Sequence, residues 1–211
     1  MNFKDFWMDV LRSAAIVGIV MAISHIFEKH IMLFSGLGLG VSSLIISIEG
    51  IVAAVLFVGM LYYFTRRLAK GWNERVEYMG QVLNVKFSYS RALSYVLTVS
   101  MLASIIVGVA STIYVDIIGY DIYLAAQIAY IEETVDFVNA AGQMSGSENL
   151  VSVESMEDFV SQLEASERPS MFANIISLMS SYMLYGGLTG LVVAAVARRN
   201  IKQNESSEYH E

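Results

Sequence analysis

Four long apolar runs decide what kind of protein this chain can form. They lie at about 13–33, 44–64, 94–117 and 170–197. Each is close to the roughly 20 residues that a helix needs to cross the hydrocarbon core of a bilayer. Within lipid, the backbone amides of such a run must find partners inside the run, which favours a helix. The pattern therefore predicts an all-α, polytopic membrane protein with four transmembrane helices.

The amino-acid composition also argues against a soluble domain. Apolar residues make up 55% of the 211 residues and charged residues only 16%, whereas soluble domains usually carry about 25% charged residues. The chain has no cysteine, so disulfides and thiol chemistry are excluded. The net charge of −7 comes mostly from the segment between the third and fourth runs and predicts no binding to nucleic acid. The bilayer is the first partner that we expect.

Basic residues are distributed unevenly along the chain, and their distribution predicts the orientation. Of the 13 lysines and arginines, 11 precede the first run, lie in the connection 65–93 or follow the fourth run. The segment 116–170 has Arg168 as its single basic residue, against 11 carboxylates. An excess of Lys and Arg marks the cytoplasmic side of a membrane. We therefore expect both termini and the basic connection in the cytoplasm, and the acidic segment 118–169 outside it.

The acidic outer segment has the periodicity of helices. Apolar residues recur three and four positions apart from Tyr120 to Val138, which predicts one face of a helix that continues the third span. Gly142 is placed to end this helix, and a shorter helix is predicted from Val153 to Leu163. Two interpretations stay open. The two helices form a hairpin whose apolar faces pack on each other, or they form a docking surface for a protein partner.

Small residues recur at every fourth position in three of the four runs. Such stripes let helix backbones approach each other closely in a membrane. One interpretation is packing within a single four-helix bundle, and the other is a homo-oligomer formed through the stripe in the fourth run. The candidate helix-packing residues are Gly18, Ser104, Gly108, Gly186 and Gly190.

One carboxylate, Glu49, interrupts the second apolar run, IISIEGIVAAV (45–55). Ionisable residues within spans usually face the bundle interior or a cavity and are candidates for function. His25 lies at a similar depth in the antiparallel first span and is the predicted partner of Glu49. Glu28 shares a helix face with His25. The candidate binding residues are thus Glu49, His25 and Glu28, and the alternative is a solvated Glu49 near a helix start, helped by neighbouring serines.

The residues that metal or catalytic sites need are scarce. The run HIFEKH (25–30) holds two histidines five positions apart, which do not share a helix face, and no cysteine is available to complete a zinc site. The remaining histidine, His210, lies in a polar tail. No nucleophile with its base and orienting group is recognised. We expect a protein that is not an enzyme and that carries no cofactor and no metal.

The order of these parts resembles a known family. Two spans are followed by a basic connection that ends in KFSYSRAL (86–93), a third span, an acidic helical segment, and a fourth span that ends in VAAVARRN (193–200). This order is similar to that of the Bacteroidota inner-membrane proteins of domain of unknown function 4199. The resemblance covers nearly the whole chain. It implies four spans and a bacterial inner-membrane location, and it implies no activity and no site residues.

Two functions are compatible with these features. The first is a non-enzymatic membrane subunit or scaffold that binds another envelope protein through the acidic outer segment. The second is a small oligomeric transporter or channel in which Glu49 and His25 line the path. The second function predicts that Glu49→Gln abolishes flux, whereas the first predicts a protein that copurifies with the chain. An enzyme acting on lipid is the third alternative.

Overall fold

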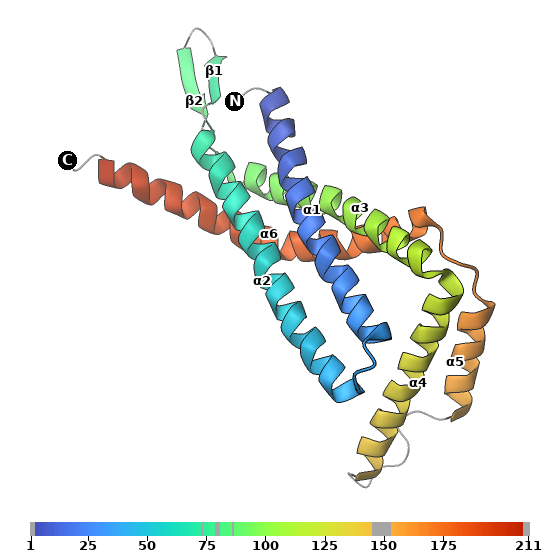
Figure 1. Cartoon of the computed structure of the whole chain (residues 1–211). Coiled ribbons are helices and arrows are strands. Elements are labelled where there is room, and N and C mark those ends of the chain that lie inside the picture. The colour runs from blue at the N-terminus through green and yellow to red at the C-terminus, as the bar shows by residue number, and fades with distance from the viewer. Residues whose placement is uncertain (1–2, 73, 79–80, 86, 145–152, 209–211) are drawn as a thin grey trace.

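Helices dominate the part of the chain that the structure describes. This computed structural model describes residues 3–72, 74–78, 81–85, 87–144 and 153–208. The elements, in chain order, are α1 (Phe3–Phe34), α2 (Leu39–Gly71), β1 (Glu74–Tyr78), β2 (Gln81–Val85), α3 (Tyr89–Ile118), α4 (Tyr120–Met144), α5 (Val153–Ala165) and α6 (Met171–Glu208) (Figure 1).

Four of these helices are long and apolar enough to cross a membrane. The stretches concerned are Asp5–Phe34, Leu39–Gly71, Tyr89–Ile118 and Met171–Ala197. The predicted all-α, polytopic fold is therefore confirmed. The helices extend beyond the predicted apolar runs because a helix that has formed adds one hydrogen bond for each further residue, whether that residue is apolar or polar.

Helix α3 is the centre of the bundle. Half of its most apolar stretch is buried inside the chain, against 11% of the corresponding stretches of α2 and α6. It packs along both α1 and α6, and Figure 1 shows α1 and α2 running together across α3 and α6. Large apolar side chains such as Ile51 on α2 and Leu184 on α6 are exposed. In a membrane these outward faces contact lipid instead of water.

The candidate helix-packing residues of the first and third spans lie at helix contacts. A Cβ atom added to Gly18 of α1 would lie 2.8 Å from Ile106 Cδ1 of α3. A Cβ atom added to Gly108 of α3 would lie 2.7 Å from Ile175 Cγ1 of α6. Ser104, one turn before Gly108 on α3, is fully buried. Both glycines therefore allow backbone approaches that a larger residue would prevent.

The two candidate glycines of the fourth span also contact α3. A Cβ atom on Gly186 would lie 2.6 Å from the Cβ atom of Ser100, and one on Gly190 would lie 2.9 Å from Leu93 Cδ1. Both glycines are buried within the single chain. The stripe of α6 is thus occupied by α3, as the interpretation of packing within one bundle requires.

A polar network joins three helices at the end of the bundle that carries the N-terminus and the β-hairpin. The guanidinium of Arg67 on α2 donates to Asp9 Oδ1 on α1. The hydroxyl of Tyr95 on α3 donates to Asp9 Oδ2 at 2.8 Å and lies 2.8 Å from Ser13 Oγ. Both Tyr95 and Ser13 are fully buried. Asp9 therefore connects α1, α2 and α3 through one carboxylate.

A β-hairpin occupies part of the connection between α2 and α3, which the sequence analysis treated only as a basic connection. Strands β1 and β2 pair antiparallel, with Glu74 opposite Val85 and Tyr78 opposite Gln81. Apolar residues lie two positions apart in ERVEY (Val76 and Tyr78) and in QVLNV (Leu83 and Val85), which is the period of a strand. The hairpin is a small addition that leaves the fold class unchanged.

A single residue separates α3 from α4. Gly119 has φ +96°, a left-handed conformation that favours glycine, and it bends the chain between the two helices. The helix predicted from Tyr120 is therefore α4, which follows the third span directly but after a bend. Helix α4 runs to Met144, two residues beyond the predicted end at Gly142. The shorter helix predicted from Val153 is α5, which lies beside α4 (Figure 1).

Candidate functional site

The predicted intramembrane carboxylate, Glu49, has a partner on the neighbouring helix. The hydroxyl of Ser24 on α1 donates to Glu49 Oε1 on α2, and both side chains are half-buried. The hydrogen-bond partner of Glu49 is therefore Ser24, one position before the predicted partner, His25. Successive residues of a helix point about 100° apart, so a shift of one position turns His25 to a different side of α1.

His25 and Glu28 form a separate pair within α1. His25 Nδ1 lies 3.8 Å from Glu28 Oε2, as expected for residues three apart on a helix. The three candidate binding residues thus form two local pairs, Ser24–Glu49 and His25–Glu28. Within the described residues, no group of three His, Cys, Asp or Glu side chains is placed to hold a metal ion.

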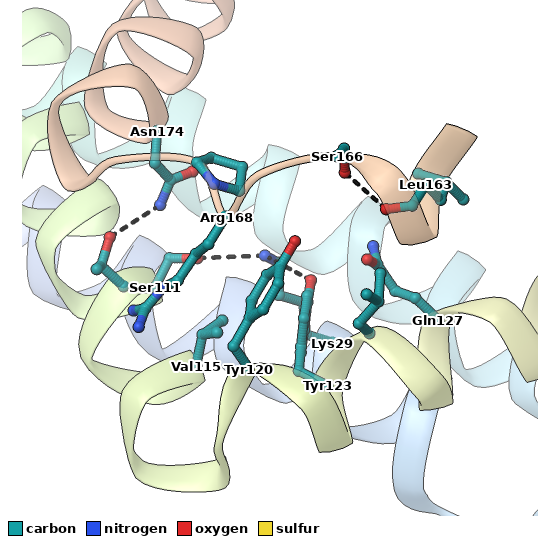
Figure 2. Close-up of a pocket in the computed structure, with 13 residues that line it drawn as sticks. Lys29, Ser111, Val115, Tyr120, Tyr123, Gln127, Leu163, Ser166, Arg168 and Asn174 are labelled. Atoms are coloured by element: carbon teal, nitrogen blue, oxygen red, sulfur yellow. Dashed lines mark hydrogen bonds between the residues drawn. The ribbon is translucent and has the colours of Figure 1, made fainter. Parts of the chain in front are cut away.

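A cavity of about 230 Å³ lies where α1, α3, α4 and the end of α5 meet the chain that enters α6 (Figure 2). Its base is buried and its rim is exposed. The base includes Ser111, Thr112 and Tyr123, whereas the rim includes Ser166, Arg168 and Pro169. The remaining lining residues are Lys29, Val115, Tyr120, Leu124, Gln127, Leu163 and Asn174.

Lys29 places an ammonium group at the base of this cavity. It lies near the end of α1, and its Nζ atom donates to Ser111 Oγ of α3 at 3.2 Å and to the Tyr123 hydroxyl of α4 at 3.1 Å. Dashed lines in Figure 2 mark these bonds. The Nζ atom also lies 5.3 Å from the centroid of the Tyr123 ring. Both hydroxyls that accept hydrogen bonds from Nζ are thus neutral groups.

Asn174 comes to the cavity from the first turn of α6. Its side-chain nitrogen donates to Thr112 Oγ1 at 3.1 Å and to the Gly108 carbonyl at 3.3 Å, both on α3. The turn that carries it begins at Ser170, whose hydroxyl accepts a hydrogen bond from the Ala173 amide at 3.2 Å. This serine is a typical helix N-cap, and it orients the first turn of α6 toward α3.

Arg168 closes the rim on the chain between α5 and α6. Its guanidinium pairs with Asp116 at the end of α3 and lies 5.8 Å from the centroid of the Tyr120 ring. The side chain is exposed, so the pair itself contributes little stability. Its geometric effect is to hold a second cationic group beside the cavity that Lys29 enters.

The cavity has a lining that is rich in hydrogen-bond donors and has a positive charge. Two of its 13 lining residues are cationic and none is acidic, although residues 116–170 hold 11 carboxylates. Protein-family models, curated proteins and solved structures were searched, and none matches this chain. The chemistry of the cavity must therefore be inferred from its own residues.

Sequence reasoning did not identify Lys29, Arg168 or Asn174 as site residues. They come from three segments that lie far apart in the sequence, and no local motif connects them. One signal was present, because Arg168 is the only basic residue of an otherwise acidic segment. A second was the position of Lys29 in the polar end of the first apolar run. Neither signal predicts that the two residues meet.

An open depression lies on another face, between the α1–α2 turn and α4. It is lined by residues 38–41 and by Glu133, Asp136 and Phe137. The Leu39 amide at the start of α2 donates to Glu133 Oε1 at 3.3 Å, an arrangement in which a carboxylate meets the positive end of a helix dipole. Phe137 is 59% exposed and Val41 is 53% exposed. Apolar surface and carboxylates therefore occur side by side in this depression.

Proposed function

We propose that the chain is a bacterial inner-membrane protein with both termini in the cytoplasm, and that it is a non-enzymatic subunit or scaffold that binds another envelope protein through α4 of the acidic outer segment. The location rests on the resemblance in the order of parts and on the position of the basic residues. The binding function rests on one observation, the open depression between the α1–α2 turn and α4.

The depression has the chemistry of a protein-binding surface. Exposed aromatic side chains supply much of the binding energy at protein interfaces, and Phe137 is such a side chain on a segment that is otherwise acidic. Glu133 and Asp136 flank it. A complementary partner therefore presents an apolar side chain to Phe137 and Lys or Arg side chains to the two carboxylates. Such charge complementarity gives specificity and a fast association rate.

The alternative function, transport through Glu49 and His25, receives less support. Glu49 is engaged by Ser24 between two neighbouring helices, and His25 is close to Glu28. Neither the cavity nor the depression described above includes Glu49 or His25 in its lining. These two hollows therefore give no support to a solute path through Glu49 and His25.

Single cysteines test the orientation, because the chain has none of its own. We expect Gln162→Cys, on the exposed face of α5, to react in intact cells with a maleimide that cannot cross the inner membrane. Lys70→Cys, exposed at the end of α2, should react only after the membrane is opened. Labelling of both variants in detergent is the control for reactivity. The reverse pattern in intact cells would refute the proposed orientation.

A photo-crosslinking residue in place of Phe137 tests the binding function in the native host. We expect one cross-linked product with a second protein species, present at a constant ratio to the chain. The charge reversals Glu133→Lys and Asp136→Lys should together lower its yield by at least about tenfold, since like charges across an interface cost several kcal/mol.

Matched variants make this result specific. Glu132→Lys reverses an exposed carboxylate of α4 that does not line the depression, so it should leave the yield unchanged. The photo-crosslinking residue at Ile51, which is 67% exposed on α2, should capture lipid. A product formed only with a second copy of the chain, or a yield that does not respond to the two charge reversals, would overturn the proposed binding of a different protein.

A further inference from the structure

We propose that the cavity around Lys29 binds a phosphate group, and that it takes this group from a phospholipid headgroup or from a free phosphate. This proposal does not depend on the partner-binding function, because the cavity and the depression are lined by different residues. Three observations support the proposal. The lining of the cavity is rich in hydrogen-bond donors, it contains no carboxylate, and the cavity lies near the ends of three candidate spans.

The first step is the number of donors that remain for a ligand. An ammonium group carries three N–H donors, and Lys29 uses two of them on Ser111 and Tyr123. These two hydroxyls accept hydrogen bonds from Lys29, so the O–H group of each can donate a hydrogen bond to a ligand oxygen. A phosphate oxygen next to Lys29 would therefore meet one N–H and two O–H donors within a few ångströms.

The second step is the charge of the site. Charge-assisted hydrogen bonds from Lys or Arg to phosphate are short and strong. Lys29 supplies one positive charge at the buried base, and Arg168 supplies another at the rim. Arg168 is paired with Asp116, but a guanidinium has five N–H donors, so donors remain for a ligand. Tyr120 and Gln127 add a hydroxyl and an amide to the same lining.

The third step is the size and position of the cavity. Its volume of about 230 Å³ is below the roughly 300–1,000 Å³ of sites that enclose a drug-sized ligand, and it suits a headgroup instead of a whole ligand. The candidate spans end at Phe34 in α1 and at Ile118 in α3, and the last span starts at Met171 in α6. Lys29, Val115 and Asn174 thus lie within a few residues of these ends, and the polar headgroups of a bilayer flank the hydrocarbon core that such spans cross.

Native mass spectrometry of the intact protein in mild detergent tests the proposal. The probes are short-chain phosphatidylglycerol, phosphatidylcholine of the same chain length, and inorganic phosphate. We expect Lys29→Met to weaken phosphatidylglycerol binding by about tenfold or more, which is the effect of losing a charge-assisted hydrogen bond. Lys70→Met removes the same charge from an exposed position at the far end of α2, so it should leave binding unchanged.

The three probes separate the two sources of the phosphate. Binding of phosphatidylglycerol that depends on Lys29, together with no binding of inorganic phosphate at millimolar concentration, identifies the lipid as the source. Binding of inorganic phosphate with the same dependence identifies a free phosphate. Retention of both phospholipids to the same extent, with no response to Lys29→Met, would overturn the proposal.

A second variant keeps the test valid if Lys29→Met does not fold. Arg168→Met removes the exposed cation at the rim and leaves the buried contacts of Lys29 intact. We expect it to weaken phosphatidylglycerol binding several-fold, while the melting temperature without ligand stays close to that of the unmodified chain. Unchanged phosphatidylglycerol affinity in a folded Arg168→Met protein would contradict the proposed site.

Discussion

Gly186→Ala should destabilise the chain by about 1–3 kcal/mol, the usual cost of forcing extra atoms into a packed interior. The added Cβ atom would lie 2.6 Å from the Cβ atom of Ser100 and would overlap its hydroxyl. Ser100 cannot move away easily because it is fully buried on α3, the central helix. The shift in unfolding free energy can be measured by steric trapping or by thermal unfolding in detergent.

The adjacent glycine is a matched control for this substitution. A Cβ atom on Gly187 would meet its nearest neighbour, Leu97 Cδ2, at 3.8 Å, so Gly187→Ala should be neutral or slightly stabilising. Both substitutions bring the same change in helix propensity, and their difference reports the steric contact alone. Ser100→Gly in the Gly186→Ala background should recover part of the loss. Equal effects at residues 186 and 187 would show that α6 does not pack on α3 in this register.

Asp9→Ala should cost about 1.5–3 kcal/mol of unfolding free energy, the range for hydrogen bonds to charged groups. The substitution removes the acceptor of the Tyr95 hydroxyl and the carboxylate that pairs with Arg67. Arg67 contributes the smaller part, because its side chain is 39% exposed and water can replace the lost partner. Tyr95 contributes the larger part, because its hydroxyl stays buried and retains only the contact with Ser13.

A double-mutant cycle with Tyr95→Phe measures this coupling directly. If the two side chains interact, the double variant should lose less stability than the sum of the single variants by more than about 0.5 kcal/mol. Glu132→Ala, which removes an exposed carboxylate on α4, is the control for the change in net charge and should have little effect. Additive losses from Asp9→Ala and Tyr95→Phe would indicate that the polar network does not hold α1 against α3.

The membrane-spanning part of the fold could be predicted because the cost of placing polar groups in lipid acts on each segment separately. The length and apolar character of residues 44–64 predict a span without information from any other part of the chain. The bend at Gly119 could not be predicted in this way, since the residues before and after it are both helical. The β-hairpin was missed for a different reason. Each strand has only five residues, and apolar and polar residues alternate over only part of it, so the period of a strand is too short to be recognised.

The polar sites depend on how the helices are rotated and aligned, and the sequence contains little information about that alignment. Glu49 was expected to meet His25, and a shift of one residue along α1 gave Ser24 instead. The cavity was harder to predict, because Lys29 and Asn174 are 145 positions apart in the sequence. They come together only because both donate hydrogen bonds to side chains of α3. Local sequence patterns identify residues whose polarity is unusual for their segment. They do not say which of these residues meet.

The joint at Gly119 determines how the two ends of the molecule can influence each other. The Gly119 amide donates to Val115 in α3 at 2.9 Å, and its carbonyl accepts from Tyr123 in α4 at 3.0 Å. Gly119 is therefore hydrogen-bonded to both helices, and it is the single residue between them. We therefore expect a displacement of α4 to be transmitted directly to α3. Tyr123, which accepts a hydrogen bond from Lys29, lies one turn from the bend.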